Sequence, residues 1–530
     1  MFNILRAPDH VSVSTEETHH HLRPDPGSAS MSWTHHDIDV RLVSGQNRIS
    51  IEIAAPQHSL LSVHLRWNGE VSEEWRFLGD HWERGYGDLE WRGLVPERVM
   101  PWYFLANDGK TTHSYGVEVG AASLCFWRVD SQGVSLWLDV RCGGCGVQLG
   151  SRTLQAATLL YREGNSNESP SGAARAFCQQ MCPNPLMPKQ PIYGGNDWYY
   201  AYGNNSHQTI LRDASTIREL ASSSDNNPVM VIDDGWQLCN RPVNGGPWRS
   251  GNREFPDMAG LAAQMQAMQV RPGIWFRPLV TSEKVPDSWL FGSHRPIIEW
   301  GDRALDPSVP EVLSLIAADV RQLVDWGYQV IKHDFSTYDI FGRWGFTMGH
   351  EITDANWSFA DRSRTSAEII RQMYVTLREA AGDAVLIGCN VIGHLAAGLV
   401  EIQRTGDDTS GRDWERTRKM GINTLAFRMA QHETFFASDA DCVGLTNQVP
   451  WHLNRQWLFL LARSGTPLFV SAAPDALGPE QKAALRDAFA LAAQPQPAAE
   501  PLDWLNNTSP RRWKFGEETV TFNWFDEKTF

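Results

Sequence analysis

VIKHDFS, residues 330–336, is the stretch from which the fold of this chain can be read. Its first half is a short apolar strand, and the strand ends in charged residues. Successive side chains of a strand alternate between its two faces, so Lys332 and Asp334 are predicted to lie on the same face. A charged pair at the end of a buried strand is unfavourable unless its charges are paired or used. The pair is therefore either a self-satisfying ion pair or part of a functional site.

Apolar strands alternate with helices on both sides of this stretch. The clearest helix carries apolar residues three or four positions apart between Val312 and Val324 and ends at Gly327, and another is predicted over residues 364–381. Eight strands alternating with helices predict a (β/α)8 barrel. The strands are predicted at 192–198, 229–234, 271–278, 329–334, 384–389, 399–404, 434–437 and 467–472, the seventh being the weakest.

A doubly wound sheet is the alternative arrangement of such strands. That fold would carry a glycine-rich phosphate-binding turn after its first strand. Here the turn is NDWYY, residues 196–200, which is aromatic instead. The barrel is therefore the favoured architecture.

The regions on either side of the barrel are predicted to be rich in β-strands. Residues 1–187 are predicted to form an N-terminal β-sandwich domain, and the prolines between 183 and 191 mark its boundary. The barrel domain is placed at 188–475, and residues 476–530 are predicted to form a small C-terminal β domain. Candidate strands lie at 47–53, 62–67, 123–129 and 134–140 in the first region; the last region holds a helix at 479–493 and strands at 512–515 and 519–524.

The composition bounds the classes of partner. With 530 residues and 42% apolar composition, the chain is long enough for two or three domains. A net charge of -15 argues against nucleic acid and anionic membranes as partners. No run of about 18 apolar residues predicts a membrane span, and the N-terminal segment lacks the apolar region of a signal peptide, so a cytoplasmic protein is expected. The 23 tryptophans are suggestive of sugar binding, although most tryptophans are core residues.

No metal site and no cofactor are expected. Cys142-Gly-Gly-Cys145 has a metal-like spacing, but no second pair follows at the distance of a zinc site. The eight cysteines are therefore expected to be reduced and structural. The histidines at 19–21 and 35–36 lack acidic neighbours and are treated as incidental surface residues.

Acidic residues follow several of the predicted strands at the ends where a barrel of this type has its active site. They are Asp233 and Asp234 after strand two, Asp334 after strand four, Asp407 and Asp408 after strand six, and the SDADC segment, residues 438–442, at strand seven. One acidic strand end is commonly a helix cap or a turn residue. Four of them predict that the carboxylates converge in one site.

Glycoside hydrolysis is the chemistry that needs two carboxylates and no metal. A retaining enzyme holds its two carboxyl groups roughly 5–5.5 Å apart, one as nucleophile and the other as acid and base. The nucleophile must stay ionised, and Lys332 on the same strand face supplies the cation that lowers its pKa. The acid must be protonated at first, and we expect a neighbouring carboxylate to raise its pKa.

Extended segments of the barrel region carry a family resemblance. They are VIDDGWQ, GIWFRPLV, LDPSVPEVLSLIAADVRQLVDWGYQVIKHDF, IGCNVIGHLAAGLVEIQRTGDDTSGRDW and SDADCVGLT. Through them, residues 191 to about 475 resemble the α-galactosidases of glycoside hydrolase clan D, in particular the family 36 melibiases. The flanking β regions are also similar, though less specifically. The resemblance implies a retaining enzyme that hydrolyses terminal α-galactosides through a covalent glycosyl-aspartate intermediate.

The resemblance also implies roles for individual residues. Asp334 matches the nucleophile. The family's acid/base follows an arginine with three residues between them, which selects Asp408 from Arg404 and leaves Asp407 as its rival. The residues implied to bind the sugar are Asp233 and Asp234 at O4 and O6, Lys332 at a ring hydroxyl, Arg404 on the O2 side, and Trp198, Trp236 and Trp275 as subsite walls that could equally be core. Cys389 and Asn390 are also substrate-binding candidates, but they stand where other branches of the family carry more glycine, so a different pocket around O2 is expected.

Three features depart from the family pattern or lie beyond it. His333 faces away from Lys332 and Asp334 by strand alternation, so we expect it to pack between strand and helix. Arg277 is not expected in the common pattern and is a candidate for recognising an acidic or bulky substituent. Residues 336–363 carry six aromatic residues and form either a lid or aglycone platform or a packed excursion.

Several functions remain open at this level. An α-galactosyl transglycosylase or an α-N-acetylgalactosaminidase would use the same site, because one or two side chains decide such preferences. A non-catalytic sugar-binding barrel is disfavoured by the presence of both Asp334 and Asp408. A metal-dependent hydrolase is disfavoured because no His-x-His pair closes a strand. The oligomeric state is not determined by the sequence.

Overall fold

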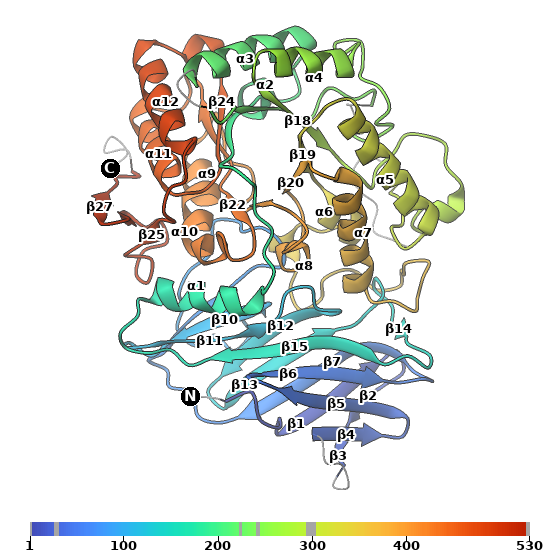
Figure 1. Cartoon of the computed structure of the whole chain (residues 1–530). Coiled ribbons are helices and arrows are strands. Elements are labelled where there is room, and N and C mark those ends of the chain that lie inside the picture. Colours follow the sequence, from blue (N-terminus) through green and yellow to red (C-terminus); the bar gives the residue numbers. More distant parts are fainter. Residues whose placement is uncertain (1–2, 26–30, 222–224, 240–243, 293–303, 526–530) are drawn as a thin grey trace.

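The computed structural model describes residues 3–25, 31–221, 225–239, 244–292 and 304–525. In chain order it contains two antiparallel sheets, a parallel sheet surrounded by helices, and a three-stranded antiparallel sheet near the C-terminus (Figure 1). The parallel sheet and its helices form one end of the molecule, and the two antiparallel sheets form the other.

The two N-terminal sheets pack through rings that both contribute. Phe104 of one sheet lies 5.7 Å from Trp127 of the other, measured between ring centroids, and alternate residues of each strand are buried, so we interpret them as a β-sandwich. The first sheet contains β1 (His10–Thr15), β2 (His19–His21), β7 (Ser59–Asn68), β9 (Met100–Pro101), β12 (Leu124–Asp130), β13 (Gly133–Asp139) and β14 (Val147–Gln148). The second contains β3 (Arg23–Pro24), β4 (Met31–His35), β5 (Ile38–Gly45), β6 (Arg48–Ala54), β8 (Arg76–Gly79), β10 (Tyr103–Asn107), β11 (Thr112–Val117) and β15 (Leu154–Arg162).

A curled parallel sheet of nine strands follows the helix α1 (Pro170–Met181). Its strands are β16 (Tyr193–Asn196), β17 (Val229–Ile232), β18 (Arg271–Phe276), β19 (Val330–His333), β20 (Val385–Gly388), β21 (Ile402–Arg404), β22 (Ala437–Asp439), β23 (Cys442–Leu445) and β24 (Leu468–Ala472). Each pair of neighbours in the order β22-β21-β20-β19-β18-β17-β16-β24-β23 runs in parallel. The two strands at the ends of this order, β22 and β23, are separated in the chain by only Ala440 and Asp441.

Helices lie between most of these strands. In α5 (Pro310–Asp325) the buried residues Val312, Ile316 and Val320 repeat at helical spacing and form the face that packs inward. A capping box opens α7 (Ser366–Ala381), with the Thr365 hydroxyl accepting from the Glu368 amide at 3.1 Å. The other helices of the region are α2 (Trp198–Ala201), α3 (His207–Leu220), α4 (Met258–Ala267), α6 (Ser336–Phe341), α8 (Gly393–Ala396), α9 (Trp414–Thr417), α10 (Thr424–Arg428), α11 (Trp451–Arg463) and α12 (Pro479–Ala492).

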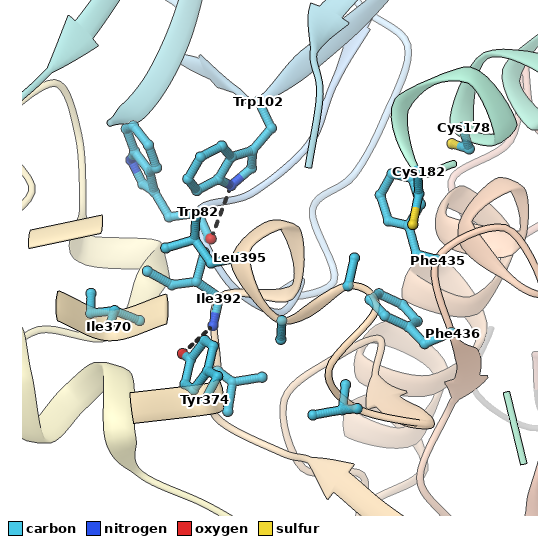
Figure 2. Packing of buried hydrophobic residues seen from close by; sticks show 14 of the residues in the cluster. Trp82, Trp102, Cys178, Cys182, Ile370, Tyr374, Ile392, Leu395, Phe435 and Phe436 are labelled. Atoms are coloured by element: carbon cyan, nitrogen blue, oxygen red, sulfur yellow. Dashed lines mark hydrogen bonds between the residues drawn. The ribbon is translucent and has the colours of Figure 1, made fainter. Parts of the chain in front are cut away.

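One hydrophobic core joins the N-terminal sheets to the helical part. Figure 2 shows Trp82 and Trp102 of the N-terminal part beside Ile370 and Tyr374 of α7 and Leu395 of α8. The Trp102 indole donates to the Trp82 carbonyl at 3.1 Å. Because these side chains are buried together, the segment after β8 is packed against the helices α7 and α8.

The predicted strands correspond to observed ones with one exception. The seventh strand, expected at 434–437, is wrong in position: β22 begins at Ala437, and β23 continues the path after a break. The reason is that this segment carries Ser438, Asp439 and Asp441 inside it, and strand patterning relies on an unbroken apolar run. Near the C-terminus, β25 (Glu500–Pro501), β26 (Arg512–Phe515) and β27 (Glu518–Thr521) form the small sheet, while α12 packs against α11 and α3.

Candidate active site

The end of β19 places Lys332 and Asp334 on one face, as the alternation predicts. The Lys332 Nζ lies 2.6 Å from Oδ2 of Asp233, which follows β17 on the far side of β18. The indole of Trp275 donates to Asp334 Oδ2 at 3.0 Å. His333 points the other way, to the expected position between strand and helix, with its ring centroid 5.7 Å from that of Tyr374 in α7.

The backbone directly after Asp334 is strained. Phe335 has φ of +64°, a left-handed conformation that a bulky residue rarely adopts. Its amide donates to the Asp334 Oδ1 at 2.8 Å. Both oxygens of this carboxylate are therefore held by donors, one from the backbone and one from Trp275. Strain of this kind concentrates at functional positions.

The end of β17 places two adjacent carboxylates beside this group. Asp233 is buried and accepts from Asn196 at 2.7 Å as well as from Lys332. Asp234 accepts from Gln237 at 2.5 Å and from Asn244 at 3.4 Å. Burial is the main reason that the pKa of Asp234 rises to about 6.

The end of β21 adds a cation that links two further acids. A single nitrogen of Arg404, Nη2, lies 2.8 Å from Asp441 Oδ2 and 3.2 Å from Asp408 Oδ1. The Arg404 side chain is 1% exposed and that of Asp408 is 38% exposed, so Asp408 is the member of this cluster that solvent reaches. Asp441, like Phe335, is a non-glycine residue with positive φ, at +72°.

The N-terminal β part contributes an arginine to the same site. Arg84, in the loop that follows β8, lies 2.7 Å from Asp407 and 4.0 Å from Asp408, measured from its guanidinium nitrogens to the nearest carboxylate oxygens. Arg416 of α9 pairs with the other oxygen of Asp407 at 2.8 Å. Asp407 is thus held between two arginines, whereas Asp408 has a partly exposed carboxylate.

Charges within the cluster set the protonation of the central carboxylates. Burial opposes the charge on Asp334, but Lys332 and Arg84 overcome that effect and hold the pKa of Asp334 below its ordinary value. In the same way Asp233 keeps the pKa of Lys332 well above its ordinary value despite burial. The central lysine is therefore charged and the carboxylate beside it is ionised.

The expectation that the second acid has a raised pKa is wrong for the free site. Burial does favour the neutral form of Asp408, but Arg404, Arg84 and Lys332 outweigh it and lower the pKa of Asp408 to about 2. Asp334 repels Asp408 as expected. The cations outweigh this repulsion, because four positive groups act on the carboxylate: Arg404, Arg84, Lys332 and Arg416.

The remaining predicted site residues divide into those that border the cluster and those that support it. Cys389 is buried beside two cations, with its Sγ 3.4 Å from Arg404 and 3.8 Å from Arg84. The side chain of Asn390 bonds to Glu83 and accepts from the Tyr338 amide at 3.0 Å, so it supports the surrounding loops. Trp198 is half-buried at the start of α2.

Of the two placements left open for Trp236, subsite wall or core, the structure fits the core placement. Its ring is fully buried and packs against Trp248 and Trp326 at centroid distances of 5.5 and 6.1 Å, and its indole donates to the Trp275 carbonyl at 2.9 Å. Trp326 caps α5, so this ring belongs to the layer between strands and helices. Trp275 is also buried, and it contacts the site through its N–H, which donates to Asp334.

Arg277 is engaged by the protein itself rather than presented to a substituent. Its guanidinium forms a two-pronged pair with Asp339, the closest approach being 2.6 Å, and the two side chains are 3% and 0% exposed. It also lies 4.4 Å from the ring centroid of Phe335. This pair fixes α6, which begins directly after the strained residue.

Removing this cation is expected to act on stability. We predict that R277M lowers the free energy of unfolding by about 3–5 kcal/mol, because it removes the buried guanidinium that pairs with Asp339. The double variant R277M/D339N is expected to regain part of that loss. Urea unfolding followed by fluorescence measures both, and an R277M chain as stable as its parent would contradict this account of the pair.

Residues 336–363 combine a part that borders the cluster with a part that is packed. Tyr338 stacks on Trp344 at 4.4 Å, and Trp344 lies 5.2 Å from the Arg84 guanidinium. Further along, Trp357 and Phe359 are buried against each other. Phe346 is 59% exposed.

Sequence patterns missed the contributions of Arg84, Glu83 and Asp441. Glu83 is buried, bonds to Asn390 and accepts from the Gly345 amide at 2.8 Å. Arg84 and Glu83 lie in an irregular loop far from the barrel in sequence, so no periodicity signals their position. Asp441 is part of an acidic segment that the sequence does indicate, but the ion pair between Asp441 and Arg404 is not predicted from the sequence.

The described part of the chain contains no group of three or more His, Cys, Asp or Glu residues arranged to hold a metal ion. All eight cysteines are free thiols. Within the described ranges, no helix is both long and apolar enough to cross a membrane.

Comparison with known proteins places the fold. No protein-family model matches the chain, and no curated protein matches it. Among solved structures, it is similar to TtGalA, an α-galactosidase from Thermus thermophilus in complex with p-nitrophenyl α-D-galactopyranoside. The TM-score is 0.62 and the identity 19%, over 97% of this chain and 99% of that one.

Two further similarities point to the same fold. A variant of the family 36 α-galactosidase AgaA from Geobacillus stearothermophilus, solved with 1-deoxygalactonojirimycin, has a TM-score of 0.60 and 14% identity over 92% of this chain and 75% of that one. An α-galactosidase from Lactobacillus brevis gives 0.59 and 14%, over 92% and 70%. The chain therefore shares the fold of family 36 α-galactosidases, the family suggested by its sequence segments.

Proposed function

We propose that this chain is a retaining α-galactosidase that hydrolyses terminal α-galactosides through a covalent glycosyl-aspartate intermediate. The observation that carries the proposal is the pairing of an ionised, donor-held Asp334 with a partly exposed Asp408 among shared cations at the ends of parallel strands. The similarity of the fold to α-galactosidases solved with galactosides and with an iminosugar supports it.

In the proposed first step, an Asp334 oxygen attacks the anomeric carbon while the Asp408 proton passes to the departing glycosidic oxygen. The carbon–oxygen bond to the aglycone breaks as the ester to Asp334 forms. In the second step Asp408, now ionised, takes a proton from water. That water attacks the same carbon and releases Asp334, so the sugar leaves with its original configuration.

Asp233, Asp234 and Lys332 are proposed to bind the ring hydroxyls of the sugar. Two adjacent carboxylates can accept several O–H bonds, and Lys332 can donate to a hydroxyl while paired with Asp233. Arg404 and Cys389 would lie on the O2 side, and Arg84 would contact the Cys389 thiol without binding the sugar. Two guanidinium groups against one thiol leave that side crowded, which favours a hydroxyl there over an acetamido group and so galactose over N-acetylgalactosamine.

We also propose that the nine parallel strands form an eight-stranded (β/α)8 barrel. In this interpretation β22 and β23 are two pieces of one strand, interrupted at Ala440 and Asp441; one pairs with β21 and the other with β24. The domain division at 1–187, 188–475 and 476–530 is kept as part of the same proposal, with α12 packed on the barrel helix α11.

The proposal is tested by the substrates cleaved and by the anomer released. We expect turnover of p-nitrophenyl α-D-galactopyranoside and raffinose, and none of the matching β-galactoside. Proton NMR of an early reaction mixture should show α-galactose before mutarotation. First appearance of β-galactose would exclude the retaining mechanism, and no cleavage of any α-galactoside would exclude the activity. Added acceptor sugars would reveal transglycosylation as new oligosaccharides.

A further inference from the structure

We propose that Arg84, carried to the site by the N-terminal β part, is a positioning residue that selects Asp408 over Asp407 as the acid and sets the pH range in which Asp408 donates its proton. The inference rests on the proposed function and adds a role for a part of the chain outside the parallel sheet.

Two neighbouring aspartates compete for one role, and their contacts distinguish them. Asp407 is bound on one oxygen by Arg84 at 2.7 Å and on the other by Arg416 at 2.8 Å. Both of its oxygens are therefore occupied by cations of the protein. Asp408 receives the same Arg84 only at 4.0 Å and keeps 38% of its side chain exposed. Arg84 thus ties down one carboxylate and leaves the other available to a substrate.

The backbone around Arg84 is fixed directly to the segment that bears both aspartates. The Gly85 amide donates to the Thr405 carbonyl at 2.8 Å, and the Asp407 amide donates to the Gly85 carbonyl at 2.9 Å. Both glycines also pack closely against a third segment, because an added Cβ at Gly85 would lie 2.9 Å from a Thr424 methyl and one at Gly406 would lie 2.1 Å from the Met420 carbonyl oxygen.

The preceding residues anchor the same loop. The Trp82 ring packs against Trp102 at a centroid distance of 5.6 Å (Figure 2). The Trp82 indole donates to the Gly349 carbonyl at 3.0 Å. The Glu83 carbonyl accepts from Arg428 at 2.5 Å. The residues before and after Arg84 are therefore both anchored. The Arg84 side chain has little freedom, because the residue is only 5% exposed.

The charge of Arg84 acts on Asp408 together with its other neighbours. A cation at 4 Å favours the ionised form of a carboxyl group, whereas the nearby anions oppose that effect. Arg84 also helps to hold the pKa of Asp334 low, so removing it moves the titration of both carboxylates to higher pH. The charged and titratable groups that face Asp408 are Arg404 and Asp407 from its own segment, Arg84 from the N-terminal part, Lys332 and Asp334 from β19, Arg416 from α9, Tyr199 from α2 and Asp441 from the β22–β23 break.

The test compares pH profiles of kcat/KM for the parent chain, R84M and R84K. Methyl α-D-galactopyranoside has a poor leaving group and needs the proton of Asp408, and p-nitrophenyl α-D-galactopyranoside needs it less. In R84M the alkaline limb for the methyl glycoside is expected to move up by about one pH unit. The limb for the nitrophenyl substrate is expected to be shallower in both chains, because that substrate depends less on the proton. R84K keeps the charge and is expected to restore most of the parent profile.

A matched control lies in the same loop. Arg92 pairs with Glu90 at 2.5 Å and its side chain is 46% exposed, so R92M removes an arginine of this loop without touching either aspartate. Its pH profile should equal that of the parent. If R84M does not fold, R84M/D407N removes the carboxylate together with its cation and is measured in its place.

Three results would overturn the inference: an unmoved alkaline limb in R84M, an equal movement in R92M, or a rise in KM alone, which would make Arg84 a substrate ligand. A parent chain inactive on both substrates would instead overturn the proposed function. In that case the titration of the Asp408 carboxyl group is measured without turnover by infrared difference spectroscopy. The difference spectrum between D408N and its parent is recorded once with Arg84 present and once in the R84M background. An Asp408 titration that does not move on loss of Arg84 would then overturn the inference by itself.

Discussion

Replacement of Asp334 by asparagine is expected to lower kcat for every α-galactoside by a factor on the order of 10⁴–10⁶. The amide keeps the size and the acceptor oxygen of the carboxylate but cannot form the glycosyl ester. Lys332 remains paired with Asp233 at 2.6 Å, so the buried cation keeps a partner and the chain is expected to fold. Steady-state kinetics on p-nitrophenyl α-D-galactopyranoside measure the loss.

A control and a rescue sharpen this prediction. Asp319 in α5 is as buried as Asp334, each being 8% exposed, and D319N is expected to keep the parent kcat. In D334A, added azide should attack from the face that the carboxylate vacates and yield the β-galactosyl azide. An α-configured azide from D334A, or a kcat within tenfold of the parent in D334N, would remove Asp334 from the role of nucleophile.

Replacement of Asp408 by alanine is expected to separate substrates by their leaving groups. For methyl α-D-galactopyranoside the loss in kcat/KM should reach about 10²–10⁴-fold, which is the range of general acid catalysis. The nitrophenolate of p-nitrophenyl α-D-galactopyranoside leaves with little help from a proton, so its kcat/KM should fall far less. Measuring both substrates on one preparation makes the ratio independent of the fraction of active protein.

D407N is the matched variant for this prediction. The Asp407 carboxylate is held by Arg84 and Arg416, so its replacement is expected to change the stability of the chain and the position of the loop. Any loss of activity in D407N should therefore be alike for both substrates. A leaving-group dependence in D407N that is absent from D408A would exchange the roles of the two residues.

The low pKa of Asp408 carries a consequence for the pH optimum. Because the pKa in the free site is about 2, the protonated form needed for the first step becomes scarcer as the pH rises. Proton donation is then limited to a small fraction of molecules at neutral pH. The highest kcat/KM on galactosides with poor leaving groups is thus expected on the acid side of neutrality, where Asp334 is still ionised.

The sequence predicts the elements whose signals are local. The spacing of Lys332 and Asp334 correctly predicts a shared face, because strand alternation depends only on neighbouring residues. The strands β16 to β21 and β24 follow from apolar runs. The predicted position of the seventh strand is wrong because polar residues interrupt the apolar run, and those polar residues belong to the candidate site.

Other features depend on contacts between distant segments. Trp236 follows a strand end that carries two site aspartates, yet its ring lies between the strands and the helices, where it packs against Trp248 and Trp326. The entry of Arg84 depends on a glycine–glycine approach between residues 85 and 406, more than three hundred positions apart. Neither periodicity nor composition carries such information. The low pKa of Asp408 was not predicted because Arg84, one of the cations that lower it beside Arg404, comes from that distant loop.

The central claim is that Asp334 forms a covalent bond with the sugar, and trapping tests it most directly. Incubation with 2-deoxy-2-fluoro-α-galactosyl fluoride, followed by proteolysis and mass spectrometry, is expected to find one fluorogalactosyl group on the peptide that contains Asp334, with activity lost in proportion. An adduct on any other residue would contradict the account, and so would full turnover of α-galactosides by a chain that forms no adduct at all.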